Sequence, residues 1–331
     1  MESYDMLTAV ENGVRQAVLA TVIHVEGHAY RKQGAVMLFM EDGSSVGSIS
    51  PGCLEADLTE YRSAVWESGK PQMVEYDMRP ADDFGWGESI GCGGLLRILL
   101  EPVTGALLVS LLAIKARVDC GEEMELTRTF SDSYATIDYD WRAVSGRTPS
   151  DRRTDLSTYT SLFMPKPRVV VFGANQDAIP LVQLAISAGF RVVVADWRES
   201  MCTLERFPGA EIEVGFPEQL ISLLKLTERD YVVVMSHQYQ KDMDFVQGVM
   251  QSSLYYLGIM GSRERTERML DGLDRPEWLH YPVGLRIGSE GPFENAVSIV
   301  AQLIAIRRGT LEREELCSVA KRRDIHGLGS W

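Results

Sequence analysis

The feature that most constrains the fold is a strand, helix and strand pattern between residues 168 and 196. The β-branched run Arg168-Val-Val-Val-Phe172 leads into a helical stretch, and a second apolar run then ends at Asp196. Near-continuous apolar strands are typical of a parallel sheet that helices cover on both faces. Similar runs at 231–235 and 254–260 continue the alternation. We therefore predict an α/β fold with a doubly wound parallel sheet in the C-terminal half.

The chain has 331 residues, which favours two domains because a domain usually contains about 100–200 residues. The first hundred residues have a mixed pattern, in which strand-like runs at 17–23 and 35–40 precede a helix over 56–68. We predict a separate mixed α/β N-terminal domain over 1–105, a connecting region over 106–165 and the doubly wound domain over 166–331.

Two other helices are expected outside the strand, helix and strand pattern. One spans 106–118 in the connecting region, and a short hairpin is expected after it. The other spans 292–308, where a proline begins the helix, two arginines end it and a glycine follows. Its apolar residues recur at helical spacing, so we interpret it as a packing helix.

Composition and charge narrow the class of partner. The net charge of −14, from 47 acidic and 33 basic residues, repels phosphate backbones, so no nucleic acid partner is expected. The chain has no run of about 18 apolar residues, and its acidic N-terminus lacks the order of a secretion signal. These features favour a cytoplasmic protein without a membrane span. The five cysteines form no C-x-x-C pair, which indicates reduced thiols and neither a structural zinc site nor a disulfide framework.

The turn after the first strand of the doubly wound domain occupies the place of a dinucleotide fingerprint, which makes the domain Rossmann-like. Gly173 and Ala174 open the following helix with backbone N–H groups that favour a phosphate. Asp196 ends the next strand, where a carboxylate accepts hydrogen bonds from a ribose diol. Asn175, however, stands in place of the second glycine and hinders the approach of a pyrophosphate. His237 follows a later strand and is expected at the carboxyl edge, either in a ligand site or holding a loop.

Three further turns combine glycines with polar or thiol side chains. Gly261, Ser262 and Arg263 begin a charged helix and form a candidate anion cradle, although Ser262 is equally a simple helix cap. Cys53 and Cys92 each lie among glycines that expose the backbone. Each thiol is therefore either approachable, with a helix N-terminus favouring the thiolate of Cys53, or a small buried residue.

Taken together, these segments resemble the XdhC/CoxI family, the accessory proteins of xanthine dehydrogenase and related molybdenum hydroxylases. The segments that carry the resemblance are Glu26-Gly-His-Ala-Tyr-Arg31, Val46-Gly-Ser-Ile-Ser-Pro-Gly-Cys-Leu-Glu55, Gly91-Cys-Gly-Gly94, Asp196-Trp-Arg198, Tyr256-Leu-Gly-Ile-Met-Gly-Ser-Arg263 and Pro282-Val-Gly-Leu-Arg-Ile-Gly288. Two positions depart from the family pattern. Pro51 stands where the family often has a glycine, and Asn175 replaces the usual second glycine of the fingerprint.

The resemblance implies a cofactor chaperone rather than a catalyst. Such a protein binds molybdenum cofactor (molybdopterin), protects it, and delivers it to apo xanthine dehydrogenase or a related molybdenum hydroxylase. No catalytic residue is predicted, and no metal-ligand set is assigned, although Cys53 or Cys92 is the candidate to face the soft metal. A homodimer would shelter a pterin between subunits. The residues predicted to bind the cofactor are Cys53, Glu55, Cys92, Gly173, Ala174, Asp196, Arg198, His237, Gly261, Ser262 and Arg263.

Two alternatives remain open from the sequence. One is an NAD(P)-dependent oxidoreductase or another component of a xanthine dehydrogenase system, in which Asp196 would prefer NAD because it repels a 2′-phosphate. No catalytic set at recognisable spacing accompanies this interpretation. The other is a non-catalytic interaction protein whose Rossmann-like domain has lost its ligand, and Asn175 is its best support.

Overall fold

The chain forms two compact units, Met1–Pro165 and Lys166–Trp331, which we call the first and the second unit. The structure, a computed structural model, describes residues 2–79, 94–131, 134–144 and 157–310. Over these ranges, none of the helices combines the length and the apolar character that crossing a membrane requires. Residues 106–165, predicted as a connecting region, belong to the first unit and supply it with one helix and three strands.

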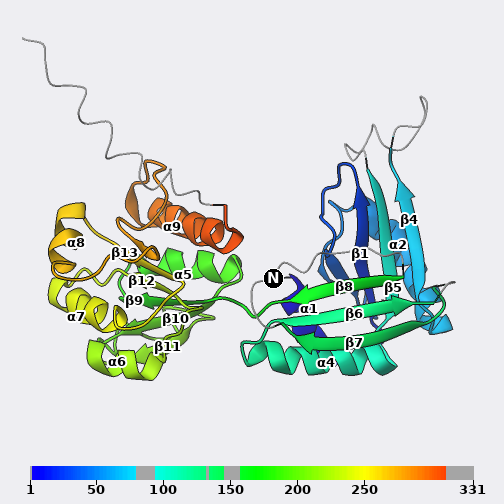
Figure 1. Ribbon diagram of the computed structural model, residues 1–331, viewed down its shortest axis with the longest axis horizontal. Coiled ribbons are helices and arrows are strands. Elements are labelled where there is room, and N and C mark those ends of the chain that lie inside the picture. Colours follow the sequence, from blue (N-terminus) through cyan, green and yellow to red (C-terminus); the bar gives the residue numbers. More distant parts are fainter. Residues whose placement is uncertain (1, 80–93, 132–133, 145–156, 311–331) are drawn as a thin grey trace, which may run out of the picture. The chain divides into compact units, whose positions relative to one another are not determined.

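The first unit contains two antiparallel sheets and three helices in its described part (Figure 1). The larger sheet has the order β3-β2-β1-β5-β4, with strands β1 (Val18–Glu26), β2 (Val36–Phe39), β3 (Ser45–Gly47), β4 (Gln72–Asp77) and β5 (Leu95–Pro102). The smaller sheet has the order β7-β6-β8, with β6 (Met124–Phe130), β7 (Ile137–Ala143) and β8 (Thr158–Phe163). The helices are α1 (Glu2–Glu11), α2 (Cys53–Ser68) and α4 (Gly105–Asp119).

The larger sheet separates two apolar layers in the first unit, because successive residues of a strand point to opposite faces. Val18 and Ala20 of β1 pack with Leu58 of α2 on one face. Leu19 packs on the other face with Leu111 of α4 and with residues of α1. The two helices around 56–68 and 106–118 that the sequence predicts thus cover opposite faces of this sheet, and α1 shares the face of α4.

A fully buried ion pair ties the smaller sheet to the larger one. Arg128 on β6 donates from Nε to both carboxylate oxygens of Glu101 on β5, at 2.9 Å, and from its terminal nitrogen to Ser161 at 2.8 Å. The Tyr139 hydroxyl donates to the same carboxylate at 3.0 Å. The side chains of Arg128 and Glu101 are 1% and 0% exposed. Their mutual attraction and their hydrogen bonds must therefore offset the cost of removing both charges from water.

The second unit is a six-stranded parallel sheet with helices on both faces (Figure 1). Its order is β11-β10-β9-β12-β13-β14, with β9 (Arg168–Phe172), β10 (Arg191–Asp196), β11 (Glu211–Val214), β12 (Tyr231–Val234), β13 (Tyr256–Ile259) and β14 (Leu279–His280). In chain order this is 3-2-1-4-5-6, the order of a Rossmann domain, with the switch between β9 and β12. The predicted fold class is confirmed.

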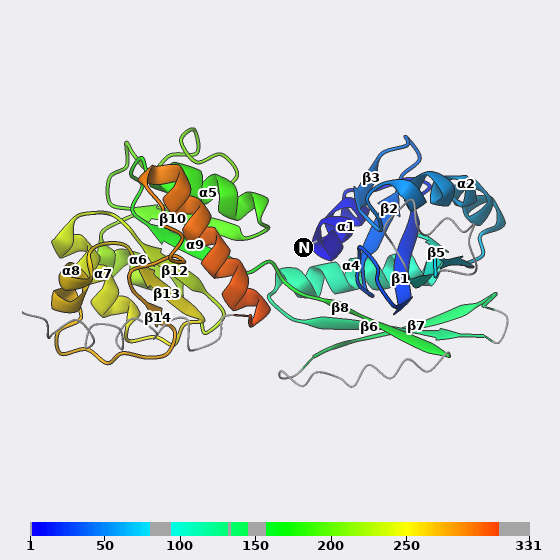
Figure 2. The ribbon, with the colours of Figure 1, turned by 90° about the horizontal axis from the view of Figure 1, so that it is seen from above.

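Alternation along the central strands again decides which helices cover which face. Val169 and Val171 face α5 (Ala178–Ser187) and α9 (Gly291–Arg308), which lie side by side (Figure 2). Val170 and Phe172 face α6 (Pro217–Leu224), α7 (Tyr239–Val249) and α8 (Arg263–Met269). Phe172 stacks on Phe245 of α7 with ring centroids 4.0 Å apart. Each such fully buried side chain stabilises the fold by about 1.5–3 kcal/mol.

Candidate functional site

The carboxyl edge of the parallel sheet is the expected ligand side of such a domain, and at its switch point two strand ends approach closely. Gly173 follows β9 with φ +120°. A Cβ at this position would lie 2.5 Å from the Cα of Ser236, which follows β12. The position therefore needs glycine for two reasons, its backbone conformation and the contact with the neighbouring strand end.

Asn175, which replaces the second glycine of the fingerprint, bridges the switch point with its side-chain amide. The amide nitrogen donates to the carbonyl of Met235 beyond β12. The amide oxygen accepts from the N–H of Ala178, the first residue of α5, at 3.0 Å. The side chain therefore ties the two strand ends together and caps α5, in the space that a fingerprint glycine would leave open.

Asp196, predicted to meet a ribose or a pterin, is fully buried and bonded to its own chain. Oδ2 accepts from the N–H of Ala174 at 2.6 Å and from the Arg198 guanidinium at 2.8 Å. Oδ1 accepts from the N–H and Nε of Arg198 at 2.8 and 2.9 Å. The hydrogen bond to Asp196 raises the pKa of Arg198. The structure thus brings three predicted residues together in one closed network, and their contact with a ligand stays a prediction.

His237 lies at the carboxyl edge as predicted, in a left-handed conformation with φ +64°. Its Nε2 lies 3.2 Å from Oδ2 of Asp177, which precedes α5, and the His237 side chain is 51% exposed. The contact links the loops after β9 and β12 across the switch point. Sequence analysis left a ligand site and a loop-holding role open for His237, and this contact is one that a loop-holding residue makes.

The turn after β13 holds Gly261, Ser262 and Arg263, of which Ser262 acts as the helix cap that the sequence left open. Its hydroxyl accepts from the N–H of Arg265 at 3.2 Å, at the start of α8. Arg263 lies on the exposed surface of α8 and pairs with Glu267 at 3.1 Å. The inward arginine is Arg265, which sequence analysis did not single out.

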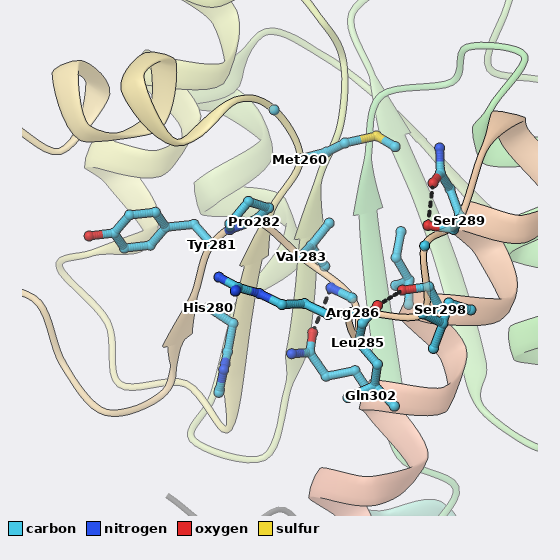
Figure 3. Close-up of a pocket in the computed structure, with 16 residues that line it drawn as sticks. Met260, His280, Tyr281, Pro282, Val283, Leu285, Arg286, Ser289, Ser298 and Gln302 are labelled. Atoms are coloured by element: carbon cyan, nitrogen blue, oxygen red, sulfur yellow. Dashed lines mark hydrogen bonds between the residues drawn. The ribbon is translucent and has the colours of Figure 1, made fainter. Parts of the chain in front are cut away.

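A pocket with a volume of about 1010 Å³ lies beside this turn (Figure 3). Its walls are Met260 and Gly261 after β13, the loop over 280–289, and polar residues of α9, chiefly Ser298 and Gln302. Gly261 is the one predicted cofactor residue that lines it. The apolar stripe of α9 predicts a packing helix only. The residues that could have indicated a pocket are Ser298 and Gln302, two polar residues one turn apart in this stripe.

Gln302 fixes the pocket loop onto α9. Its side chain is 1% exposed, and its Oε1 accepts from the Tyr256 hydroxyl at 2.6 Å and from the N–H of Gly284 at 2.8 Å. The Ser298 hydroxyl donates to the carbonyl of Leu285 at 2.6 Å. Gly284, with φ +97°, has no room for a Cβ, which would lie 2.4 Å from the Ser298 oxygen. The loop conformation is therefore set by these polar contacts.

His280 and Arg286 supply the titratable side chains of this loop. The His280 ring stacks on Tyr256 at 4.8 Å, and burial lowers its pKa to about 4, so the imidazole is neutral at pH 7. Arg286 is exposed, and among the described residues no carboxylate pairs with it. The pocket thus carries one charged group, a cation.

The predicted cysteine site of the first unit is the loop before α2. Cys53 is the first residue of this helix, and its Sγ lies 3.5 Å from the Ser50 hydroxyl oxygen. The Glu55 carboxylate accepts from the N–H groups of Ile49 and Ser50, at 3.0 and 2.6 Å, and from the Ser50 hydroxyl. Burial alone would raise the pKa of Glu55, but these hydrogen bonds outweigh it and lower the pKa. Glu55 therefore braces the loop that carries Cys53.

Of the other thiols, the structure describes Cys120 and Cys202. Cys92, predicted as a cofactor residue, lies outside the described residues, as does Cys317. Cys120 is exposed, and Cys202 is buried, which raises the pKa of Cys202 to about 11. In the described ranges, no group of three or more histidines, cysteines or carboxylates is arranged to hold a metal ion.

Comparison with known proteins identifies the family. The XdhC Rossmann domain matches residues 169–303, and the XdhC and CoxI family matches residues 11–77. A Bacillus subtilis (strain 168) protein described as a probable subunit of xanthine dehydrogenase is 36% identical over 323 residues, which cover 92% of this chain and 97% of that protein. The chain belongs to the XdhC and CoxI family. The family predicted from the sequence is confirmed.

Two further relatives of this XdhC/CoxI protein extend the likeness over most of its length. The molybdenum cofactor insertion chaperone PaoD of Escherichia coli (strain K12) is 24% identical over 90% of this chain and 85% of its own. A crystal structure described as a xanthine dehydrogenase from Bacillus halodurans superposes with a TM-score of 0.85 at 38% identity, covering 94% of this chain and 97% of the other.

Proposed function

We propose that this XdhC/CoxI protein binds molybdenum cofactor as its cargo and delivers it to an apo molybdenum hydroxylase of the xanthine dehydrogenase class. The observation that carries the proposal is the match to PaoD, a molybdenum cofactor insertion chaperone, over 90% of the chain. The Bacillus subtilis relative, described as a probable part of xanthine dehydrogenase, points to the class of partner.

The chemistry of the chain suits such a cargo. Molybdopterin combines a pterin ring and a phosphate with a dithiolene that holds a soft metal. The second unit offers donors beside the carboxyl edge of its sheet, among them Arg286, with which no carboxylate of the described residues pairs. The first unit offers Cys53 as the first residue of the 16-residue helix α2, and its sulfur is a ligand type that suits a soft metal. We therefore retain the eleven predicted residues as the proposed cofactor-binding set, in which Gly261 lines the pocket and Cys53 begins α2.

An NAD(P)-dependent oxidoreductase is the second candidate, and the strand order 3-2-1-4-5-6 is the observation that favours it. Two contacts argue against a dinucleotide bound in the usual way. The Asp196 carboxylate is already bonded to Ala174 and Arg198, and the Asn175 side chain bridges the switch point. Calorimetric titration with NAD and NADP tests this candidate, and tight binding that is lost in Asp196→Ala would favour it over the chaperone. The homodimer and the cytoplasmic location stay predictions.

The proposed function is tested by the pterin content of the purified protein. The chain is expressed in a host that makes molybdenum cofactor, the protein is oxidised, and the fluorescent pterin released per chain is measured. We expect a substantial fraction of one pterin per chain, less in Cys53→Ala, and no change in Cys120→Ala, which removes an exposed thiol outside the proposed set.

Delivery is tested in the same material. Mixing the loaded chain with apo xanthine dehydrogenase is expected to generate hydroxylase activity, whereas the filtrate of the loaded chain is not. A chain that carries no pterin at stoichiometric concentration would contradict the proposal, as would activity that appears equally with the filtrate alone.

A further inference from the structure

The pocket between the 280–289 loop and α9 is separate from the network around Asp196, and it has the size of a small-molecule site. Its volume of about 1010 Å³ greatly exceeds what an inorganic anion fills, and small-molecule sites usually enclose about 300–1,000 Å³. Apolar side chains, among them Met260, Val283 and Ile299, form much of its wall. Such a wall suits a ring system rather than a small ion.

The polar groups that face this pocket are mainly donors. Gln302 uses its Oε1 twice, towards Tyr256 and Gly284, so the orientation of its amide is fixed. The amide nitrogen has no partner among the described residues, and it is not among the atoms that the fold shuts off from solvent, so it is open to the pocket that Gln302 lines. Figure 3 shows this nitrogen and the Arg286 guanidinium both directed to the His280 side of the pocket. A donor that faces the pocket and has no partner among the described residues can bind an acceptor on a ligand.

The charge of the residues that line the pocket also restricts the kind of ligand it can bind. The chain carries a net charge of −14, yet no aspartate or glutamate is among the described residues that line the pocket. The carboxylate of Glu294 near the start of α9 is bonded to the N–H of Glu290, and neither residue lines the pocket. Arg286 therefore lines the pocket as a cation without a carboxylate partner in the described part of the chain, and such a group favours an anionic ligand.

We infer that this pocket is a binding site for a planar oxo-heterocycle that carries a phosphate, with the ring carbonyl on the Gln302 amide nitrogen and the phosphate on Arg286. Pterin phosphates and guanine nucleotides share this chemistry, because both rings present a carbonyl beside ring nitrogens. Of these two possible ligands, only the pterin phosphate rests on the proposed function. The site includes Gly261 from the predicted set and adds Arg286 and Gln302 to it.

The inference is tested by calorimetric titration of the full chain with four probes: neopterin monophosphate, GMP, neopterin without phosphate, and inorganic phosphate. We expect one of the two phosphorylated heterocycles to bind at least about tenfold more tightly than neopterin or inorganic phosphate, since ring and phosphate act together. Arg286→Ala should weaken that binding about tenfold, as expected for the loss of a charged hydrogen bond. Arg268→Ala is the matched control, because Arg268 lies exposed on α8 and pairs there with Glu264.

Gln302→Glu keeps the acceptor for Tyr256 and Gly284 but replaces the donor with a second oxygen. We expect binding of the phosphorylated heterocycle to fall about tenfold at pH 8. The other titratable groups that face this position are Tyr256, His280 and Arg286, of which His280 is neutral down to about pH 4. Binding to the Gln302→Glu chain should therefore recover as the introduced carboxyl is protonated, and the wild-type chain should show no such gain.

The outcomes separate the two sources and the two proposals. Tighter binding of neopterin monophosphate, with co-purified pterin lost in Arg286→Ala, assigns the site to the cofactor; tighter binding of GMP assigns it to a nucleotide. Equal co-purified pterin in wild type, Arg286→Ala and Gln302→Glu leaves the chaperone proposal standing and excludes the cofactor as the ligand of this pocket. The assignment fails if neither phosphorylated heterocycle binds, or if both variants bind them like the wild type.

Discussion

The carboxylate of Asp242 on α7 accepts a hydrogen bond from Arg265 on α8 at 2.6 Å, while its other oxygen holds the N–H of Ser236 at 3.2 Å. The Asp242 side chain is 1% exposed. One buried acid therefore joins two helices to the strand end that borders the switch point. Two contacts therefore hold the carboxyl edge of the sheet in place. One is made by Asp242 of α7, and the other by Asn175, which precedes α5.

We predict that Arg265→Met destabilises the second unit by about 3 kcal/mol, because it leaves the Asp242 charge buried without its partner. Hydrogen exchange of the α7 amides in the full chain measures the effect, since it reports the second unit directly. Arg268→Met on the same helix, at an exposed ion pair, should change the exchange by less than about 0.5 kcal/mol. Equal protection in the two variants would show that the Asp242 pair is not stabilising.

Gly173→Ala is expected to destabilise the second unit by about 3 kcal/mol or more. The substitution forces an L side chain to φ +120° and into the Cα of Ser236. Gly272→Ala is the control, because Gly272 has φ +74° but nothing within 4 Å of an added Cβ, and about 1 kcal/mol is expected there. Urea unfolding of both variants gives the comparison; similar losses would mean that the close approach of the strand ends matters little.

In the first unit, Arg128→Met is expected to cost about 3–5 kcal/mol, since Glu101 then stays buried as an unpaired charge. Adding Glu101→Leu should recover most of this loss, because an apolar pair of similar volume replaces the ion pair without a desolvated charge. Urea midpoints of the two single variants and the double variant form a double-mutant cycle. A double variant no more stable than Arg128→Met would contradict the buried-charge explanation.

Stability should depend on pH through His280. Burial lowers its pKa from 6.5 to about 4, so between these values the unfolded chain binds a proton that the folded chain excludes. The neutral His280 side chain therefore makes its full contribution to the free energy of unfolding above about pH 6.5. As the pH falls towards 4, the free energy of unfolding decreases by up to about 3 kcal/mol. Unfolding followed at pH 4–8 measures it. His280→Phe should flatten the curve in this window, and an unchanged slope would assign the loss to other groups.

Local patterns were enough to predict the second unit's architecture. The run 168–172 and the strand that ends at Asp196 are apolar on both faces, and this property of a parallel strand is visible without knowing its neighbours. The predicted bounds of β9 agree with the structure. β6 and β7 form a hairpin of the kind expected after α4, but β8 was missed because it pairs with β6 across a long stretch of chain, as in the pair Met124 and Phe163.

The sequence by itself determined the family, the doubly wound sheet and the placing of Gly173, His237 and Gly261 at strand ends, because each follows from residue type and short-range spacing. Only the tertiary structure decided how the side chains are used. It shows that the Asp196 carboxylate is hydrogen-bonded to Ala174 and Arg198, and that the Gln302 side chain lines a pocket. The physical reason is that hydrogen bonds and desolvation depend on distances across the fold, and the spacing of residues along the chain does not contain those distances.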